Sequence, residues 1–230
     1  RIKGKVIPVT TVKTHLHAIL ENGTEIKGEH NIDEPEHDGR LRIEKVFLHP
    51  KAKANPDAVE ALKKADVIVI GPGDLYTSII PNILVQGIPE AIRESNAVKI
   101  FVCNLMTKYG QTNNFSAEDH INILEKYLND GLDYVIVNVQ SPEKEALKKY
   151  EKKHNVQPVR LSGKKISRKI KIVKATLLKS LVAKAQKGDT LSRSLIRHDP
   201  DKLARQIMKL IEKKPLLSLF KWPGVEESAE

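Results

Sequence analysis

A glycine-rich stretch of hydrogen-bonding residues follows the apolar segment Asp66–Ile70 and reads GPGDLYTSIIPN. Its two glycines, Gly71 and Gly73, allow the backbone to turn without a Cβ and to approach a ligand closely. A helix that starts near Leu75 would direct free N–H groups and its dipole at an anion such as phosphate. The alternative is a tight turn whose hydroxyl groups only cap a helix, because one glycine-rich loop is a weak motif. The candidate polar residues here are Asp74, Tyr76, Thr77, Ser78 and Asn82.

A second polar stretch, NLMTKYGQTNNFSAEDH, runs from Asn104 to His120 after another apolar segment. Polar loops of this length between regular elements are often functional, although a plain surface connection is the alternative. Asn138, followed by Gln140 and Ser141, ends a third apolar segment. Polar residues thus follow three apolar segments, and together they strengthen the case for a binding site. The candidate residues of the second stretch are Asn104, Thr107, Gly110, Gln111 and Thr112.

Other reactive residue types give weaker indications. His15 and His17 share one face of a predicted strand, but no third ligand at useful spacing accompanies them, so we predict no metal site. Cys103 lies in an apolar strand, where an inert buried thiol is expected. His120 follows a helix-capping residue and could face a ligand, yet we assign it no role as a general base. No catalytic residue is assigned, because spacing alone does not identify a Ser/His/Asp arrangement.

Strands and helices alternate along the middle of the chain. The Asn22-Gly23 pair predicts a hairpin turn, and Asn55, Ser116 and Asp199 are expected to cap helices. We predict strands at Val6–Val9, His15–Leu20, Thr24–Ile26, Ile43–Leu48, Asp66–Ile70, Lys99–Cys103, Tyr134–Val139, Val156–Leu161 and Lys169–Leu178. We predict helices at Pro56–Lys64, Ile88–Glu94, Ala117–Leu128, Glu143–His154 and about Pro200–Ile211.

This alternation predicts an α/β fold: a three-layer, Rossmann-like arrangement with a largely parallel sheet and a small antiparallel extension near the N-terminus. In such a sheet, ligands bind beyond the carboxyl ends of the strands, which is where the polar loops lie. We expect one domain over residues 1–214 and a short tail over 215–230 that docks through its apolar side chains.

The composition supports a globular protein of the reducing cytosol. Of 230 residues, 40% are apolar and 30% charged, which excludes a disordered chain. Aromatic residues make up only 4%, which argues against a stacking platform for single-stranded nucleic acid. The single cysteine excludes an internal disulfide. We expect neither a membrane span nor a signal peptide, and the first residue is arginine.

The net charge of +10 is concentrated in one segment. Arg160 to Arg193 holds eleven lysines and arginines against one acid, and the rest of the chain has 28 charges of each sign. Such a segment could meet phosphates or an anionic membrane surface. We favour a solvated edge whose lysines prevent sheet-to-sheet aggregation, since no aromatic residue interleaves them. No specific nucleic-acid partner is predicted.

The two loop blocks, GPGDLYTSIIPNILV (71–85) and NLMTKYGQT (104–112) with the following FSAEDH, resemble the signature blocks of the YvcK-like family of gluconeogenesis factors. That family belongs to the CofD-like superfamily of 2-phospho-L-lactate transferases. The segments GKVIPVT (4–10) and NGTEIKGEHNI (22–32) resemble two more of its blocks. The resemblance extends from about Arg1 to Ile211.

The resemblance implies a bacterial cytoplasmic protein that binds UDP-sugars, notably UDP-N-acetylglucosamine. It also implies a regulatory link between carbon metabolism, cell-wall precursor supply and cell shape, with a protein partner in precursor synthesis and self-association into a homo-oligomer. The transferase branch moves a phospholactyl group from a nucleotide-activated donor onto a deazaflavin.

Two departures from the family favour binding over catalysis. Family members open with a Gly-rich strand-loop-helix that this sequence does not contain, and Tyr109 and Gln111 stand where a proline and a glutamate are expected. We therefore expect a ligand-binding regulator without a cofactor. The alternative is a transferase in which Asp74 holds Mg²⁺ beside a diphosphate. A third possibility, a nucleic-acid or membrane module using residues 160–193, predicts binding that weakens steeply with salt.

Overall fold

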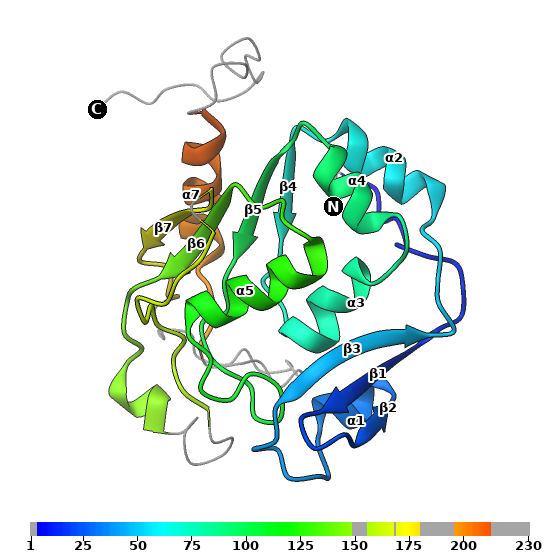
Figure 1. Ribbon diagram of the computed structural model, residues 1–230. Coiled ribbons are helices and arrows are strands. Elements are labelled where there is room, and N and C mark those ends of the chain that lie inside the picture. The colour runs from blue at the N-terminus through cyan, green and yellow to red at the C-terminus, as the bar shows by residue number, and fades with distance from the viewer. Residues whose placement is uncertain (1–3, 149–155, 168, 180–195, 213–230) are drawn as a thin grey trace, which may run out of the picture.

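A computed structural model describes residues 4–148, 156–167, 169–179 and 196–212 (Figure 1). In this part of the chain, the main sheet has four parallel strands in the order β4-β5-β6-β7. Each connection between consecutive strands crosses over, as a parallel sheet requires. The predicted α/β fold with a largely parallel sheet is therefore confirmed. Its strands are β4 (Val67–Ile70), β5 (Val98–Val102), β6 (Tyr134–Asn138) and β7 (Lys171–Ala175).

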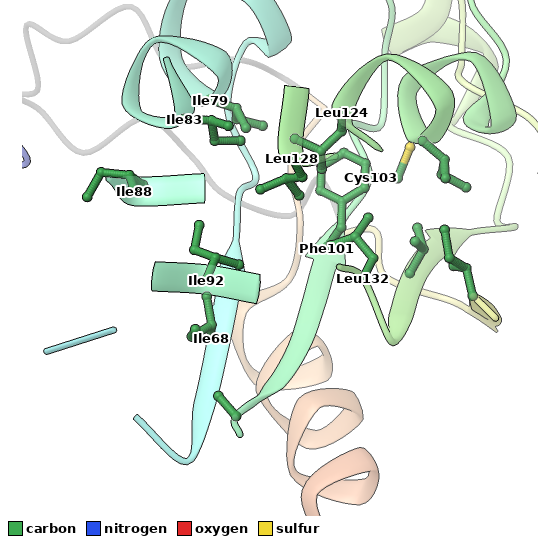
Figure 2. Packing of buried hydrophobic residues seen from close by; sticks show 14 of the residues in the cluster. Ile68, Ile79, Ile83, Ile88, Ile92, Phe101, Cys103, Leu124, Leu128 and Leu132 are labelled. Carbon is green, nitrogen blue, oxygen red and sulfur yellow. The ribbon is translucent and has the colours of Figure 1, made fainter. Parts of the chain in front are cut away.

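Helices cover both faces of this sheet. On one face, α4 (Ile88–Glu94) and α5 (Ala117–Leu128) pack with Phe101 and other buried side chains, and Figure 2 shows this cluster. On the other face, α7 (Pro200–Glu212) packs against Ile100 and Ile136. Burial on both faces explains why the central strands β5 and β6 are mostly apolar. Helix α2 (Pro56–Lys64) adds to the first face and packs against α4.

Local signals set the beginnings of these helices as predicted. The side chain of Asn55 accepts a hydrogen bond from the backbone of Asp57 at 3.1 Å. Ser116 and Asp119 form a reciprocal capping box at the start of α5. The carboxylate of Asp199 accepts from the backbone N–H groups of the first turn of α7. Each contact satisfies donors that a helix start leaves open.

The predicted antiparallel extension is also present. Its three strands pair in the order β2-β1-β3 and are β1 (His15–Leu20), β2 (Glu25–Lys27) and β3 (Ile43–His49). The hairpin between β1 and β2 turns at Gly23, whose φ is +83°. The hydroxyl of Tyr127 on α5 accepts a hydrogen bond from the Val46 N–H at 2.9 Å, which ties this sheet to the main domain.

A short π-helix lies between the two sheets. This helix, η1 (Leu75–Ile79), is followed directly by α3 (Ile80–Ile83). Leu75 and Tyr76 belong to the core of the small sheet, whereas Ile79 and Ile83 belong to the core of the main sheet. A further short helix, α1 (Glu29–Asp33), which the sequence did not predict, packs beside β1. Single turns of π-helix are rare and frequently occur at functional sites.

Two predicted strands are wrong. Residues 6–9 form no strand, and Val9 instead accepts a backbone hydrogen bond from Asn55. Residues 156–161 contain only an isolated bridge at Pro158. Their backbone bonds to the loop after β5, for example from Val159 N–H to Leu105 O at 2.9 Å, because β7 already pairs with β6.

Other predictions fall partly or wholly outside the described residues. The predicted helix Glu143–His154 is described only to residue 148 and is helical over 144–148. The tail 215–230 lies outside the described residues, as do residues 168 and 180–193 of the basic segment. Cys103 is buried as expected, and burial raises the pKa of its thiol to about 12. No helix in the described ranges is long and apolar enough to cross a membrane.

Replacing Glu125 with glutamine should stabilise the protein at pH 8 but not at pH 5. Burial raises the pKa of this carboxyl to about 7, although it accepts a hydrogen bond from the Leu132 N–H, and the charge of Asp130 raises it further. The folded state thus retains a proton between pH 4.5 and about 7, and this stabilisation is lost as the pH rises through 7. Because the group is half-exposed, we expect a gain of about 1 kcal/mol at pH 8.

Urea unfolding of the Glu125→Gln variant and the wild type at both pH values measures this difference. Glu44→Gln, at an exposed position of β3, is the control and should show no such pH dependence. If Glu125→Gln changes the free energy of unfolding equally at pH 5 and pH 8, the raised pKa of Glu125 is contradicted.

Candidate functional site

The turn after β4 is shaped by close backbone contacts. Gly71 has φ +78°, and a Cβ there would lie 3.1 Å from the carbonyl oxygen of Val102 at the end of β5. The π-helix η1 begins at Leu75, and the N–H groups of Ser78 and Ile79 both donate to the carbonyl oxygen of Asp74. The predicted helix start is therefore confirmed, in a π-helical form that the sequence did not indicate.

Asn104 joins the loops after β4 and β5. Its Nδ2 donates to the carbonyl oxygen of Gly73 at 2.8 Å. Its Oδ1 is buried and has no hydrogen-bond partner among the described residues. A buried polar atom without a partner is costly, and a ligand or a water molecule commonly supplies the missing bond. The two glycine-containing loops thus lie side by side at the carboxyl edge of the sheet, as the parallel fold predicts.

An ionic group, which we call the Lys108 cluster, lies next to this contact. The Lys108 Nζ is 2.5 Å from Asp33 Oδ1 and 2.8 Å from Asp74 Oδ2. Asp33 Oδ1 also accepts from the hydroxyl of Thr77 at 3.1 Å and from the Nε2 of Gln111 at 3.0 Å. The cluster consists of Asp33, Asp74, Thr77, Lys108 and Gln111, contributed by α1, η1 with its preceding turn, and the loop after β5.

Sequence analysis identified three members of the Lys108 cluster and missed Asp33 and Lys108. Asp33 belongs to the antiparallel extension and follows no strand of the main sheet, so no pattern connected it to the other loops. Lys108 stands inside the second polar stretch, and it is the one charged residue between Asn104 and Phe115. That isolated charge among neutral polar residues was an available indication.

The charges of the Lys108 cluster favour the ionised forms. Burial alone would raise the pKa of Asp33, but the charge and hydrogen bond of Lys108, together with the bonds from Thr77 and Gln111, outweigh burial and lower it. Burial likewise opposes the charge of Lys108, yet its bonds to Asp33 and Asp74 raise the pKa of the ammonium. Two carboxylates against one ammonium leave the cluster with a net negative charge. An incoming phosphate at this turn would therefore depend on Lys108 to offset the carboxylates.

Several predicted residues hold the loops in shape. The Thr107 hydroxyl accepts from the Gln157 N–H at 2.9 Å, and the Thr112 hydroxyl accepts from the Lys108 N–H at 2.9 Å. Gly110 has φ +79° and lies against Pro35. Tyr76 is only 1% exposed in the core of the small sheet, and its hydroxyl has no partner within the described ranges. Burial raises the pKa of this phenol.

Other predicted residues line a groove of about 570 Å³ beside β4. Its walls are apolar side chains from α2, α4 and the N-terminal segment, including Ile7 and Val9. Its polar end is the turn after β4. The structure therefore divides the predicted residues of that turn between the groove and the Lys108 cluster. The residues on the groove are Gly71, Gly73, Ser78 and Asn82.

The histidines identified from sequence lie apart from these loops or within the core. His15 and His17 lie on the outer face of β1, where His49 pairs opposite His15 and His17 Nδ1 is 2.8 Å from Glu25 Oε1. No three His, Cys, Asp or Glu side chains in the described ranges are arranged to hold a metal ion. His120 is buried, and its Nδ1 bonds to the carbonyl oxygen of Ser116. Burial lowers the pKa of this imidazole.

Tyr109, one of the two departures from the family pattern, contacts the segment that connects α1 to β3. A Cβ at Gly39 would overlap the Tyr109 ring, and Asn113 Nδ2 donates to the carbonyl oxygen of Gly39. The loop after β5 therefore rests on the antiparallel extension. This contact accounts for an aromatic residue at position 109.

Comparison with known proteins identifies relatives of the chain. Residues 1–178 match the family described as "2-phospho-L-lactate transferase CofD". The "Putative gluconeogenesis factor" of Aquifex aeolicus (strain VF5) is 41% identical over 219 residues, which are 94% of this chain and 63% of that protein. The "Gluconeogenesis factor" of Bacillus subtilis (strain 168) is 34% identical over 213 residues, covering 92% of this chain and 62% of that protein.

A solved structure supports the same relationship. The crystal structure of a Bacillus halodurans protein, described as a member of the UPF0052 family, matches with a TM-score of 0.76 and 33% identity. The match covers 90% of this chain and 62% of that chain. This chain thus spans about three fifths of the length of the relatives named here.

Proposed function

This chain belongs to the CofD family, and we propose that it is a regulatory protein that binds a nucleotide sugar of the UDP-N-acetylglucosamine type at the carboxyl edge of the main sheet. Its relatives named gluconeogenesis factors support a role in the control of carbon metabolism. The role we propose couples that control to cell-wall precursor supply and cell shape. We extend the proposal to a cytoplasmic location, a homo-oligomer and a protein partner in precursor synthesis.

The observation that carries the proposal is the bridge made by Asn104. Its Nδ2 fixes the Gly73 carbonyl, while its buried Oδ1 lacks a partner among the described residues. Such an oxygen suits a ligand that offers N–H or O–H donors. A UDP-sugar offers them on its uracil ring, its ribose and its acetamido sugar. The neighbouring groove would receive the less polar part of such a ligand.

Replacing Asn104 with alanine should weaken the binding of UDP-N-acetylglucosamine by a factor of roughly 5 to 150. The substitution removes both the acceptor and the bond that holds the two loops together, which together are worth about 1–3 kcal/mol. Isothermal titration of the complete gene product that carries this chain measures the affinity. A thermal-shift titration provides a second readout, because a ligand at a hundredfold excess over its Kd stabilises by about 2.7 kcal/mol.

Two variants make this experiment decisive. Asn122→Ala removes an exposed asparagine that bonds to the Lys165 carbonyl, and it should bind the ligand as the wild type does. The double variant Thr77→Ala/Asn104→Ala should lose binding while remaining folded by circular dichroism. Wild-type protein that shows no binding at millimolar ligand, or full affinity in the double variant, would refute the nucleotide-sugar assignment.

The carboxylates of the Lys108 cluster favour one alternative, a CofD-like transferase. Asp33 and Asp74 lie close enough to share one ammonium and would suit a metal-bound diphosphate. Such an enzyme would transfer a phospholactyl group from a nucleotide-activated donor to a deazaflavin hydroxyl and release the nucleotide. Mass spectrometry of that reaction, with and without Mg²⁺, separates the two functions. Gln111, which carries no carboxylate, makes the binding function the better supported one.

A further inference from the structure

We propose that Lys108 is a built-in replacement for a divalent cation, so that the carboxylate pair Asp33 and Asp74 operates without a metal. Its ammonium nitrogen lies between the two carboxylates, at 2.5 Å from one and 2.8 Å from the other. A metal ion that bridged two carboxylates would occupy the same place. The proposal concerns only residues of this chain and does not depend on the identity of the ligand.

A positive charge is required at this position. Asp33 and Asp74 come from different elements, and both side chains are partly buried, at 27% and 37% exposed. Two carboxylates this close repel each other unless a cation lies between them or one becomes protonated. Lys108, at 31% side-chain exposure, supplies that cation from the loop after β5. The ammonium thus links α1 to the turn after β4.

Gln111 orients one of the two carboxylates that Lys108 bridges. It is 3% exposed, and its Nε2 donates to Asp33 Oδ1. Because a carboxylate only accepts hydrogen bonds, the amide nitrogen must face Asp33, and the carbonyl oxygen must point elsewhere. This Oε1 is buried and has no partner in the described part of the chain. The amide of Gln111 therefore holds Asp33 in place by donating to it, and it supplies no oxygen ligand for a metal ion between the two carboxylates.

Lys108 also retains a donor for a ligand. An ammonium has three N–H groups, and the two carboxylates occupy two of them. The third can donate to an oxygen of an anionic ligand, as a metal ion would coordinate it. The wild-type site would therefore bind its ligand equally well with or without a chelator.

Removing Lys108 should convert the site into one that binds a metal. In the 230-residue chain, Lys108→Ala leaves the two carboxylates without a cation. We expect Mn²⁺ to bind this variant at least tenfold more tightly than the wild type, measured by isothermal titration and by the loss of the free Mn²⁺ electron paramagnetic resonance signal. Mn²⁺ should also raise the melting temperature of the variant, and leave that of the wild type unchanged.

Lys164 offers a matched control. It too pairs with a carboxylate, at 2.7 Å and 2.8 Å from the two oxygens of Asp119, but no second carboxylate shares its ammonium in the described residues. Lys164→Ala should therefore gain no affinity for Mn²⁺. The double variant Asp74→Asn/Lys108→Ala should lose the affinity that Lys108→Ala gains. If Lys108→Ala does not fold, Lys108→Gln removes the charge while keeping most of the side chain.

Three results would overturn the proposal. They are equal Mn²⁺ affinity in Lys108→Ala and Lys164→Ala, equally tight Mn²⁺ binding by the wild type, and Mn²⁺ binding that persists in the double variant. None of these measurements uses a nucleotide sugar. They can therefore refute the role of Lys108 without bearing on the proposed function.

Discussion

Alanine at Gly110 should lower the free energy of unfolding by about 3 kcal/mol, whereas alanine at Gly163 should lower it by about 1 kcal/mol. Both glycines have φ +79°, so both substitutions carry the same backbone strain. At Gly163 an added Cβ would meet no atom within 4 Å, but at Gly110 it would lie 2.5 Å from Pro35 Cγ. The difference between the two variants therefore isolates the contact between the loop after β5 and the antiparallel extension.

Chemical denaturation of both variants measures these costs, and the position of Gly110 gives them a functional meaning. Gly110 lies between Lys108 and Gln111, so a displaced backbone there would move both of these side chains away from Asp33. The Gly110 variant should accordingly lose affinity for the ligand, and the Gly163 variant should not. Equal stability losses in the two variants would show that the loop does not rest on Pro35.

Replacing Glu118 with alanine should destabilise the protein by about 3 kcal/mol. Glu118 is 2% exposed in the first turn of α5, and its carboxylate accepts hydrogen bonds from the N–H groups of Ser162 and Gly163 and from the Ser162 hydroxyl. Alanine would leave these donors without a partner. The segment after residue 160 would then keep only its other bonds to α5, such as those from Lys164 to Asp119 and from Asn122 to Lys165.

The loss should depend on pH with a defined sign. Burial alone would raise the pKa of Glu118, but the Ser162 and Gly163 N–H donors outweigh burial and lower it. A lowered pKa stabilises the fold above pH 4.5, and this contribution disappears as the pH falls below that value. The deficit of Glu118→Ala should therefore shrink in acid. Glu60→Ala, which removes an exposed carboxylate, is the control and should cost under about 0.5 kcal/mol. If Glu118→Ala lowers the free energy of unfolding no more than Glu60→Ala does, the role of the Glu118 carboxylate is contradicted.

Features encoded by neighbouring residues were predictable from the sequence. The helices Ile88–Glu94 and Ala117–Leu128 begin and end where predicted, because their caps and apolar spacing are local. The four parallel strands were predicted to within a few residues, since continuous apolar runs mark strands that are buried on both faces. The parallel order then placed both polar loops at one edge of the sheet.

Features that depend on tertiary contacts were not predictable. Apolar alternation at 156–161 suits a sheet strand and an extended segment that bonds to a loop equally well. Helix α1 has only five residues and begins after Gly28, which has no side chain to cap it. The burial of Ile32 therefore stabilises this helix more than local propensity does. The meeting of Asp33 with Lys108 depends on how the antiparallel extension lies against the main domain. Asp33 and Lys108 are 75 residues apart, and no sequence pattern indicates a contact between them.

The π-helix between the two sheets has a consequence for the way the protein unfolds. Leu75 and Tyr76 fill one core and Ile79 reaches into the other, so the same short helix is a wall of both. Melting either sheet would expose one side of this helix and remove support from the other. We therefore expect both sheets to lose their hydrogen-exchange protection in a single cooperative step, with equal opening free energies at Ala18 and Phe101. A domain with two sheets would then behave as one thermodynamic unit.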